Sequence, residues 1–196
     1  MKRIFDIMCS ILGLLFLSPV FLVVAYLIKK EDGGPVFYKG ERVGLHKKLF
    51  SMYKFRTMVS DAEKIGGPST SENDPRITKV GKILRKFKLD ELPQLFNVLK
   101  GEMSIVGPRP EVRKEVEYYN QGWDIIFSVK PGITDLSSIE FHNEGRIIAE
   151  SGFDDPHDAY RMLIQPQKLR LQREYALNHS FIGDLKIIVR TISMIM

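Results

Sequence analysis

The chain has 196 residues, of which 44% are hydrophobic and 27% are charged, and its formal net charge is +5. This composition excludes a disordered chain, and the length suits one domain with a sizeable core. The single cysteine, Cys9, excludes a disulfide framework and a cysteine-based zinc site, which favours a cytosol-facing protein. The basic excess is compatible with nucleic acid, an anionic membrane surface or phosphorylated substrates, and it does not choose among them.

The first thirty residues are an apolar segment. No residue between Ile7 and Ile28 is charged. A helix over this run would be about 33 Å long, close to the ~30 Å hydrocarbon core of a bilayer. A cleaved signal peptide fits poorly, because the run is long and no small-x-small cleavage site follows it. A straight spanning helix is the default interpretation of such a run.

Two features favour a re-entrant segment over a straight one. Ser18-Pro19 lies in the middle of the run, and an interior proline removes a backbone hydrogen bond and kinks a helix. Basic residues flank both ends, at Lys2-Arg3 and Lys29-Lys30, and the positive-inside rule keeps both ends in the cytoplasm. We therefore predict a helix-break-helix over residues 1–30 that dips into one leaflet, with the break at Ser18 and Pro19. A small cytosolic domain over residues 31–196 would follow.

After the apolar segment, the chain predicts a turn and two short strands. Asp32-Gly33-Gly34-Pro35 is typical of a turn, and β-like runs follow at 36–38 and 48–55. In a strand, Lys54 and Arg56 would share a face. Two cations on one face are candidates for phosphate binding, although such a pair is often only solvated.

Residues 61–78 are rich in Gly, Pro, Ser, Asn and Asp and predict a loop, whereas residues 79–89 predict a basic amphipathic helix. Its apolar stripe would be Val80, Ile83, Leu84 and Phe87, and its cations are Lys79, Lys82, Arg85, Lys86 and Lys88. This pattern fits a helix lying on an anionic membrane surface. An ordinary surface helix packed on the domain is the alternative.

Two adjacent carboxylates, Asp90 and Glu91, follow this helix and open another helical pattern. Its apolar positions are Leu92, Leu95, Phe96 and Leu99. Asp90 is a good N-cap, Pro93 is tolerated in a first turn, and Gly101 is placed as a C-terminal cap. Carboxylates at a helix N-terminus with nearby cations suit phosphoryl chemistry on a metal-bound diphosphate. A capping Asp with a first-turn Glu is the purely structural alternative.

Arg109 lies between two prolines, after a short apolar strand predicted at 103–106. Pro108 and Pro110 stiffen the backbone, so the guanidinium would be held at low entropy cost, as suits a phosphate ligand. A rigid surface turn is the alternative interpretation.

The rest of the chain predicts turns and helices. Residues 129–135 indicate a turn, 141–158 a polar loop, and 160–177 a helix interrupted near Pro166. A last apolar face would pack on the core or touch lipid, and its residues are Leu185, Ile188, Val189 and Ile192.

Several of these motifs occur in one order, and together they resemble the bacterial sugar transferase family, the monotopic phosphoglycosyl transferases. The ordered set comprises Ser18-Pro19, Glu41-Arg42-Val43-Gly44, Tyr53-Lys54-Phe55-Arg56-Thr57-Met58, Asp74-Pro75-Arg76-Ile77-Thr78, Leu89-Asp90-Glu91-Leu92-Pro93-Gln94, Asn97-Val98-Leu99-Lys100-Gly101, Met103-Ser104-Ile105-Val106-Gly107-Pro108-Arg109-Pro110 and Lys130-Pro131-Gly132-Ile133-Thr134. The resemblance covers nearly the whole chain, which looks like the minimal catalytic unit without an added N-terminal transmembrane domain.

The resemblance implies transfer of a sugar-1-phosphate from a UDP-sugar to polyprenol (undecaprenyl) phosphate, with release of UMP. It implies Mg²⁺ as cofactor and a monotopic location at the cytoplasmic face of the bacterial inner membrane. This reaction would be the first membrane step of glycoconjugate or polysaccharide assembly, with downstream glycosyltransferases as possible partners. The expected fold is α/β and helix-rich, with the re-entrant helix followed by a catalytic domain that carries amphipathic interface helices.

The resemblance also assigns roles to the candidate residues. Asp90 and Glu91 match the family's catalytic dyad, with Asp90 as the nucleophile of a phosphosugar–aspartate intermediate and both as candidate metal ligands. Glu91 would help to hold the metal or manage protons. The candidate phosphate contacts are Arg109, Lys54, Arg56 and Arg85, of which Arg109 belongs to the family's Pro-Arg-Pro loop.

Two departures from the family pattern bear on the identity of the sugar. Asp135-Leu136-Ser137-Ser138 stands where many relatives have Gly, an apolar residue and Gln, and Gln172 stands where many have Asp. The main alternative function is a membrane-anchored nucleotide- or nucleic-acid-binding protein without catalysis. Phe87 falls on the apolar stripe, so the basic helix lacks a stacking platform and we expect no nucleic-acid partner. An inactive scaffold of the same fold would not need the dyad.

Overall fold

The computed structural model describes residues 1–65, 74–119 and 121–195, so part of the loop predicted at 61–78 lies outside the described residues. The helices and strands in chain order are α1 (Lys2–Asp32), β1 (Phe37–Val43), η1 (Leu45–Lys47), β2 (Leu49–Phe55), α2 (Ala62–Ile65), α3 (Lys79–Lys86), η2 (Leu89–Glu91), α4 (Gln94–Lys100), β3 (Ser104–Val106), α5 (Arg113–Val116), η3 (Gln121–Ser128), β4 (Gly132–Thr134), α6 (Leu136–Glu140), α7 (Glu144–Ala149), α8 (Pro156–Ala159), η4 (Tyr160–Ile164), α9 (Gln165–Asn178) and α10 (Phe181–Ile195). The helix-rich α/β prediction is confirmed.

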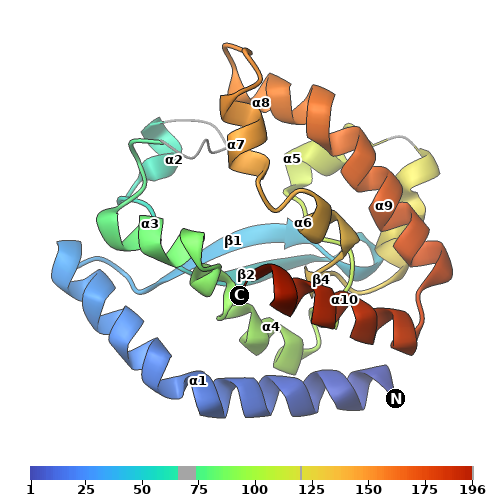
Figure 1. Cartoon of the computed structure of the whole chain (residues 1–196), viewed down its shortest axis with the longest axis horizontal. Helices are drawn as coiled ribbons and strands as arrows, with labels where there is room; N and C mark the ends of the chain where they lie inside the picture. Colours follow the sequence, from blue (N-terminus) through green and yellow to red (C-terminus); the bar gives the residue numbers. More distant parts are fainter. Residues whose placement is uncertain (66–73, 120, 196) are drawn as a thin grey trace.

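The N-terminal helix α1 is continuous through Pro19. Ser18 Oγ donates to Leu15 O at 2.8 Å, which is the carbonyl that the N–H missing from Pro19 would otherwise bond. Figure 1 shows α1 as two arms that meet at a bend, with the rest of the molecule on the inner side. The helix-break-helix that we predicted is therefore a bend within one helix.

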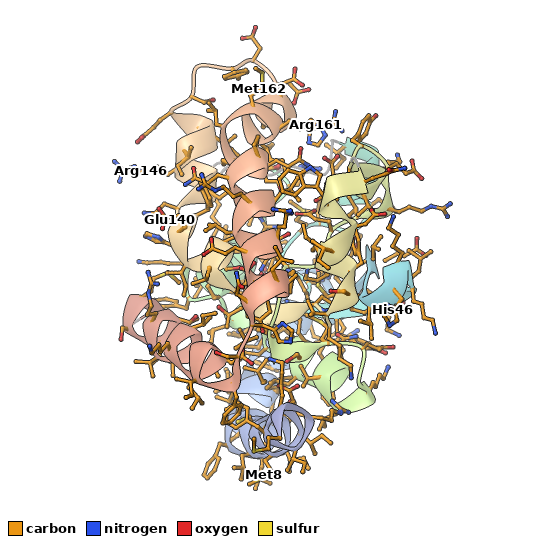
Figure 2. The ribbon with its side chains drawn as sticks, turned by 90° about the vertical axis from the view of Figure 1, so that its right-hand side faces the viewer. Met8, His46, Glu140, Arg146, Arg161 and Met162 are labelled. Carbon is orange, nitrogen blue, oxygen red and sulfur yellow. The ribbon has the colours of Figure 1, made fainter. Side chains whose placement is uncertain are left out.

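The outer side of α1 is apolar and exposed. Within the described ranges, α1 is the helix that is long and apolar enough to cross a membrane, and little of its apolar window is buried. Figure 2 places Met8 at one end of the molecule, pointing away from the body, while Arg146, Arg161 and Met162 lie toward the opposite end. The exposed apolar residues of α1 include Ile4, Ile11, Leu12, Leu15, Phe16, Leu22, Val23 and Tyr26. This surface supports association with a membrane.

The first turns of α1 are fastened to the domain by polar contacts. Lys2 Nζ forms an ion pair with Asp184 of α10 and donates to Val106 O at 2.9 Å. One turn later, the buried carboxylate of Asp6 accepts from Ser104 Oγ at 3.0 Å. Asp6 therefore binds the start of β3, and Lys2 binds its C-terminal end.

The other end of α1 is fastened to the same domain. Asp32 forms a two-pronged ion pair with Arg56. Glu31 Oε1 accepts from the backbone N–H of Lys79 at 2.7 Å, and its Oε2 accepts from that of Val80 at 3.2 Å. Glu31 thus binds free N–H groups at the N-terminus of α3.

The second arm of α1 forms a core with the segments around the dyad. Val24 and Ile28 pack in one cluster with Phe55 and Leu84. Leu92, directly after Asp90 and Glu91, packs against this cluster. Burial of such side chains contributes about 1.5–3 kcal/mol each, so the core fixes the place of the dyad.

The two described sheets each have two strands. β1 and β2 are antiparallel, with Tyr38 opposite Lys54, and β1 continues beyond the run predicted at 36–38 as far as Val43. Buried Asn97 of α4 ties β2 to the helix after the dyad, because its Oδ1 accepts from the backbone N–H of Tyr53 at 2.9 Å.

β3 and β4 are parallel, and they meet at two glycines. A Cβ at Gly107 would lie 2.3 Å from Lys130 O, and one at Gly132 would lie 2.1 Å from Gly107 N. The segment predicted as a turn at 129–135 therefore contains a strand. This close backbone approach sets the start of the Pro-Arg-Pro loop.

Residues 136–178, which hold α6 to α9, form what we call the hood, whose α7 and α8 stand at the top of Figure 1. The prediction of a polar loop over residues 141–158 was wrong, because α7 and most of α8 lie in that range. Ile148 of α7 packs in a buried cluster with Ala159, Tyr160 and Ile164, and this apolar contact stabilises the short helices. The interruption predicted near Pro166 is confirmed, since the π-helical turn η4 ends just before it.

The last helix, α10, has two faces. Ile187 and Asp184 are buried against the domain, whereas Ile182, Val189 and Ile192 are exposed. Figure 1 shows α10 above the first arm of α1, and the rings of Phe5 and Phe181 contact edge to face, with their centroids 5.4 Å apart.

Candidate active site

The dyad lies in the 3₁₀ turn η2, between α3 and α4. We predicted Asp90 as the N-cap of the following helix, but this was wrong, because α4 begins at Gln94 with Pro93 before it. Lys88 adopts a left-handed backbone conformation (φ 55°), which ends α3 and turns the chain into η2. The predicted cap at Gly101 is confirmed, with φ 86°.

Glu91 is clamped between two cations. Arg109 Nη2 donates to Glu91 Oε1 at 2.5 Å, Arg109 Nη1 donates to Oε2 at 3.3 Å, and Lys54 Nζ donates to Oε1 at 2.9 Å. Burial by itself would raise the pKa of Glu91, but Arg109 and Lys54 outweigh it and hold that pKa well below the usual range. Glu91 is therefore ionised, and it orients both cations.

Asp90 has a different environment from its neighbour. Its side chain is buried, and its carboxylate accepts no hydrogen bond within the described part of the chain, with Lys54 Nζ 3.9 Å from Oδ2. Burial raises the pKa of Asp90, while Lys54 and Arg85 oppose that rise. A weakly solvated carboxylate without hydrogen-bond donors is a good nucleophile once it is ionised.

Of the four predicted phosphate contacts, three gather around the dyad. Lys54 and Arg109 touch Glu91 directly. Arg85 donates from Nε to Thr57 Oγ1 at 3.0 Å and is near enough to Asp90 to lower the pKa of that residue. Arg56 differs, because Asp32 and Pro35 O already engage its guanidinium. It therefore stabilises the end of α1.

An open cleft joins the dyad to both the α3 side and the hood. On the α3 side it is lined by Lys82, Arg85, Lys86 and Lys88, and on the hood side by Glu111, Glu115, Glu144, Tyr160, Arg161 and Lys168. Toward α1 and α10 its lining is mainly apolar, with Gly13, Leu17, Leu95, Ile188, Ile192 and Met194 beside Thr191. The cleft therefore has a cationic wall, a wall of acidic and basic residues, and an apolar wall.

Sequence reasoning missed the polar residues of the hood side. Tyr160 OH donates to Glu111 Oε1 at 3.0 Å, and Lys168 forms an ion pair with Glu144. Glu111 stands two residues after Arg109, so the Pro-Arg-Pro-Glu order was the available signal. Tyr160, Lys168 and Glu144 come from segments that only the fold brings together.

The donor set at the dyad fits Mg²⁺ that arrives with a phosphorylated substrate. Within the described ranges, no group of three or more His, Cys, Asp or Glu side chains is placed to hold a metal ion. Mg²⁺ is commonly held by one or two carboxylates together with substrate phosphates and water. Asp90 and Glu91 provide such a pair, although both oxygens of Glu91 already bind cations.

Comparison with known proteins identifies the class to which this fold and site belong. The family model described as "Bacterial sugar transferase" matches residues 1–196, so the chain belongs to that family and is a transferase. It is 37% identical over 206 residues to the exopolysaccharide production protein ExoY of Sinorhizobium fredii, covering 97% of this chain and 83% of the relative.

Two further relatives are longer proteins. The undecaprenyl-phosphate galactose phosphotransferase of Salmonella typhimurium is 45% identical over 159 residues, which cover 74% of this chain and 33% of that protein. An Aeromonas hydrophila protein is 36% identical over 200 residues, covering all of this chain and 43% of the relative, and it is named as a UDP-N-acetylgalactosamine–undecaprenyl-phosphate N-acetylgalactosaminephosphotransferase. The chain thus spans less than half of each of these two enzymes.

Proposed function

We infer that this protein transfers a sugar-1-phosphate from a UDP-sugar to polyprenol phosphate, releasing UMP, as the first membrane step of polysaccharide assembly. The observation that carries the proposal is the buried carboxylate of Asp90 beside the Glu91–Arg109–Lys54 clamp. The names of the Salmonella and Aeromonas relatives support the substrate classes. A binding protein without catalysis has no evident use for such a carboxylate.

The reaction would take place in two displacements on phosphorus. A carboxylate oxygen of Asp90 bonds to the β-phosphorus while the bond to the bridging oxygen breaks, and UMP leaves with that electron pair. A phosphate oxygen of the acceptor lipid then bonds to the same phosphorus, and the carboxylate of Asp90 departs. Arg109, Lys54 and Arg85 would stabilise the charge on the phosphoryl oxygens.

Asp90 and Glu91 would hold Mg²⁺ together with diphosphate oxygens. When bound, the ion would supply charge neutralisation and Lewis acidity to the phosphoryl group. Glu91 would keep Arg109 and Lys54 aimed at the same region, because its carboxylate bonds both.

We also propose that α1 is re-entrant and that the domain lies at the cytoplasmic face of the inner membrane. The contacts at Lys2 and Asp6 and those at Glu31 and Asp32 support this topology, because a straight span cannot keep both helix ends on one domain. The exposed apolar faces of α1 and α10 would then lie in the leaflet. The lipid acceptor would reach Asp90 through the apolar part of the cleft between them.

Purified protein with polyprenol phosphate, magnesium and a panel of UDP-sugars tests the reaction. We expect UMP release that requires all three, and a phosphosugar adduct on the peptide that contains Asp90 when the acceptor is omitted. Release of UDP instead of UMP would contradict phosphosugar transfer, and an adduct on a different residue would contradict the role of Asp90.

A further inference from the structure

The hood side of the cleft contains a polar cluster that phosphoryl transfer does not use. It consists of Glu111, Tyr160, Lys168 and Glu144, all of which line the cleft. The Tyr160 hydroxyl binds Glu111, the ammonium of Lys168 binds Glu144, and that ammonium also lies 5.2 Å from the centre of the Tyr160 ring. The side chains of Tyr160 and Lys168 are buried, so their positions are fixed.

The position of Glu111 relative to Arg109 follows from the chain between them. Pro110 disfavours a helical conformation at Arg109, the residue before it, and two residues of extended chain span about 6–7 Å. Both side chains line the same cleft. Glu111 therefore follows Arg109 along the lining of the cleft, at a backbone separation comparable to the width of a sugar ring.

The charges on the two walls decide which part of the donor lies against the cluster. Lys82, Lys86 and Lys88 on the α3 side line the cleft and form no ion pair with any residue that the structure describes. On the hood side, Glu144 pairs with Lys168, and Glu115 of α5 pairs with Arg161 at 3.1 Å. The diphosphate is attracted to the cations that have no ion-pair partner, so one of the two uncharged ends of the donor, the hexose or the uridine, would lie against the hood side.

We propose that Glu111, oriented by Tyr160, accepts a hydrogen bond from a ring hydroxyl of the hexose and so determines which sugar is transferred. This inference rests on the proposed function and specifies the donor end of the same site. Tyr160 donates to one carboxylate oxygen of Glu111, which leaves the second oxygen as an acceptor for a sugar hydroxyl. Burial raises the pKa of Glu111, and the nearby ammonium of Lys168 opposes that rise. The π-helical turn that carries Tyr160 is a feature frequently found at functional sites.

Substrate analogues can separate a direct contact from a structural role. The wild-type enzyme is assayed with its active UDP-hexose and with analogues that lack one ring hydroxyl at a time, and kcat/KM is measured from UMP release. We expect one analogue to lose about 10- to 100-fold, as for a hydrogen bond to a charged group. The double variant Glu111→Leu/Tyr160→Phe removes both partners, so that neither is left buried without one.

In this double variant, the parent donor should lose about the same 10- to 100-fold, and the sensitive deoxy analogue should lose nothing further. Glu174→Leu is the matched control, because Glu174 is an exposed carboxylate of α9 that is not part of the cleft lining, and this variant should keep the wild-type pattern. If the double variant does not fold, Glu111→Gln is used, and discrimination against the same analogue should shrink.

Two results would overturn the proposal. One is a folded variant that still discriminates between the parent donor and every deoxyhexose analogue as strongly as the wild type does. The other is a variant whose loss of activity depends on a ribose hydroxyl of the donor instead of a hexose hydroxyl. If the wild-type enzyme released no UMP from any UDP-sugar, the proposed function itself would fail. That result differs from an active enzyme in which Glu111 does not affect the choice of hexose.

Discussion

Asp90 and Glu91 are neighbours in the chain, but their carboxyl groups have opposite electrostatic environments. Burial raises the pKa of Asp90, whereas Arg109 and Lys54 hold the pKa of Glu91 well below the usual range. At neutral pH, folding therefore places Asp90 where its ionised form is disfavoured and Glu91 where its ionised form is favoured. Each of the two residues can be replaced by its neutral amide, so the effect of each charge on the stability of the protein can be measured.

We expect Asp90→Asn to raise the melting temperature and Glu91→Gln to lower it. The first variant removes a charge that burial disfavours, and each kcal/mol gained would raise Tm by roughly 2–4 °C in a chain of this size. The second leaves Arg109 and Lys54 without their common partner. The Tm values of both variants and the wild type are measured by thermal unfolding in the same detergent. Tm shifts of the same sign in the two variants would contradict the opposite electrostatic environments of Asp90 and Glu91.

Lys54 should control the acid limb of the pH–rate profile. Asp90 must be ionised to attack, and Lys54 opposes the rise of its pKa. In Lys54→Met the pKa of Asp90 rises further, so activity is lost at a higher pH as the solution is acidified. The measurement is kcat/KM for UMP release against pH. Lys54→Arg keeps the charge and serves as control, and an acid limb at the wild-type position in Lys54→Met would exclude this coupling.

Arg109→Lys should reduce turnover even though the charge remains. The guanidinium bonds both oxygens of Glu91, and a single ammonium cannot reproduce that fork. Loss of an electrostatic stabiliser typically costs about 10²–10³ in kcat, so retention of the charge should limit the loss to the lower part of that range. Rates are compared at saturating donor with folding checked by circular dichroism. Equal rates in the two proteins would mean that charge alone suffices.

The N-terminus of α1 should be inaccessible from outside the cell. A cysteine in a short N-terminal extension, on a Cys9→Ser background, should react with an impermeant reagent only after permeabilisation. Ser18→Ala/Pro19→Ala restores the missing N–H and should straighten α1, which would favour crossing and reduce activity. Ready labelling of the parent protein in intact cells would rule out the re-entrant topology.

Local patterns in the sequence predicted the elements that depend on local signals. The helix over α3, the strand before Arg109 and the cap at Gly101 follow from periodicity and from glycine at a left-handed position. The short helices α7 and α8 were missed, because Ile148 is stabilised by contacts with residues of η4 rather than by its own neighbours.

Local sequence signals also predicted only part of the candidate site. Asp90, Glu91 and Arg109 belong to sharp motifs, and the structure brings them together. The partner of Arg56 could not be predicted, because Asp32 lies 24 residues away at the end of α1. The hydrogen bond from Tyr160 to Glu111 joins residues 49 positions apart and likewise depends on the fold.

The ion pair between Lys2 and Asp184 joins residues that are 182 positions apart. Translation delivers Lys2 first, so the leading arm of α1 is made long before its partner in α10. The ion pair can form only after α10 leaves the ribosome, whereas Ser104 and Val106, which also bind this arm, are made earlier. A nascent chain stalled before Asp184 would therefore lack one of the contacts that hold its N-terminus, so the order of synthesis sets the order in which those contacts form.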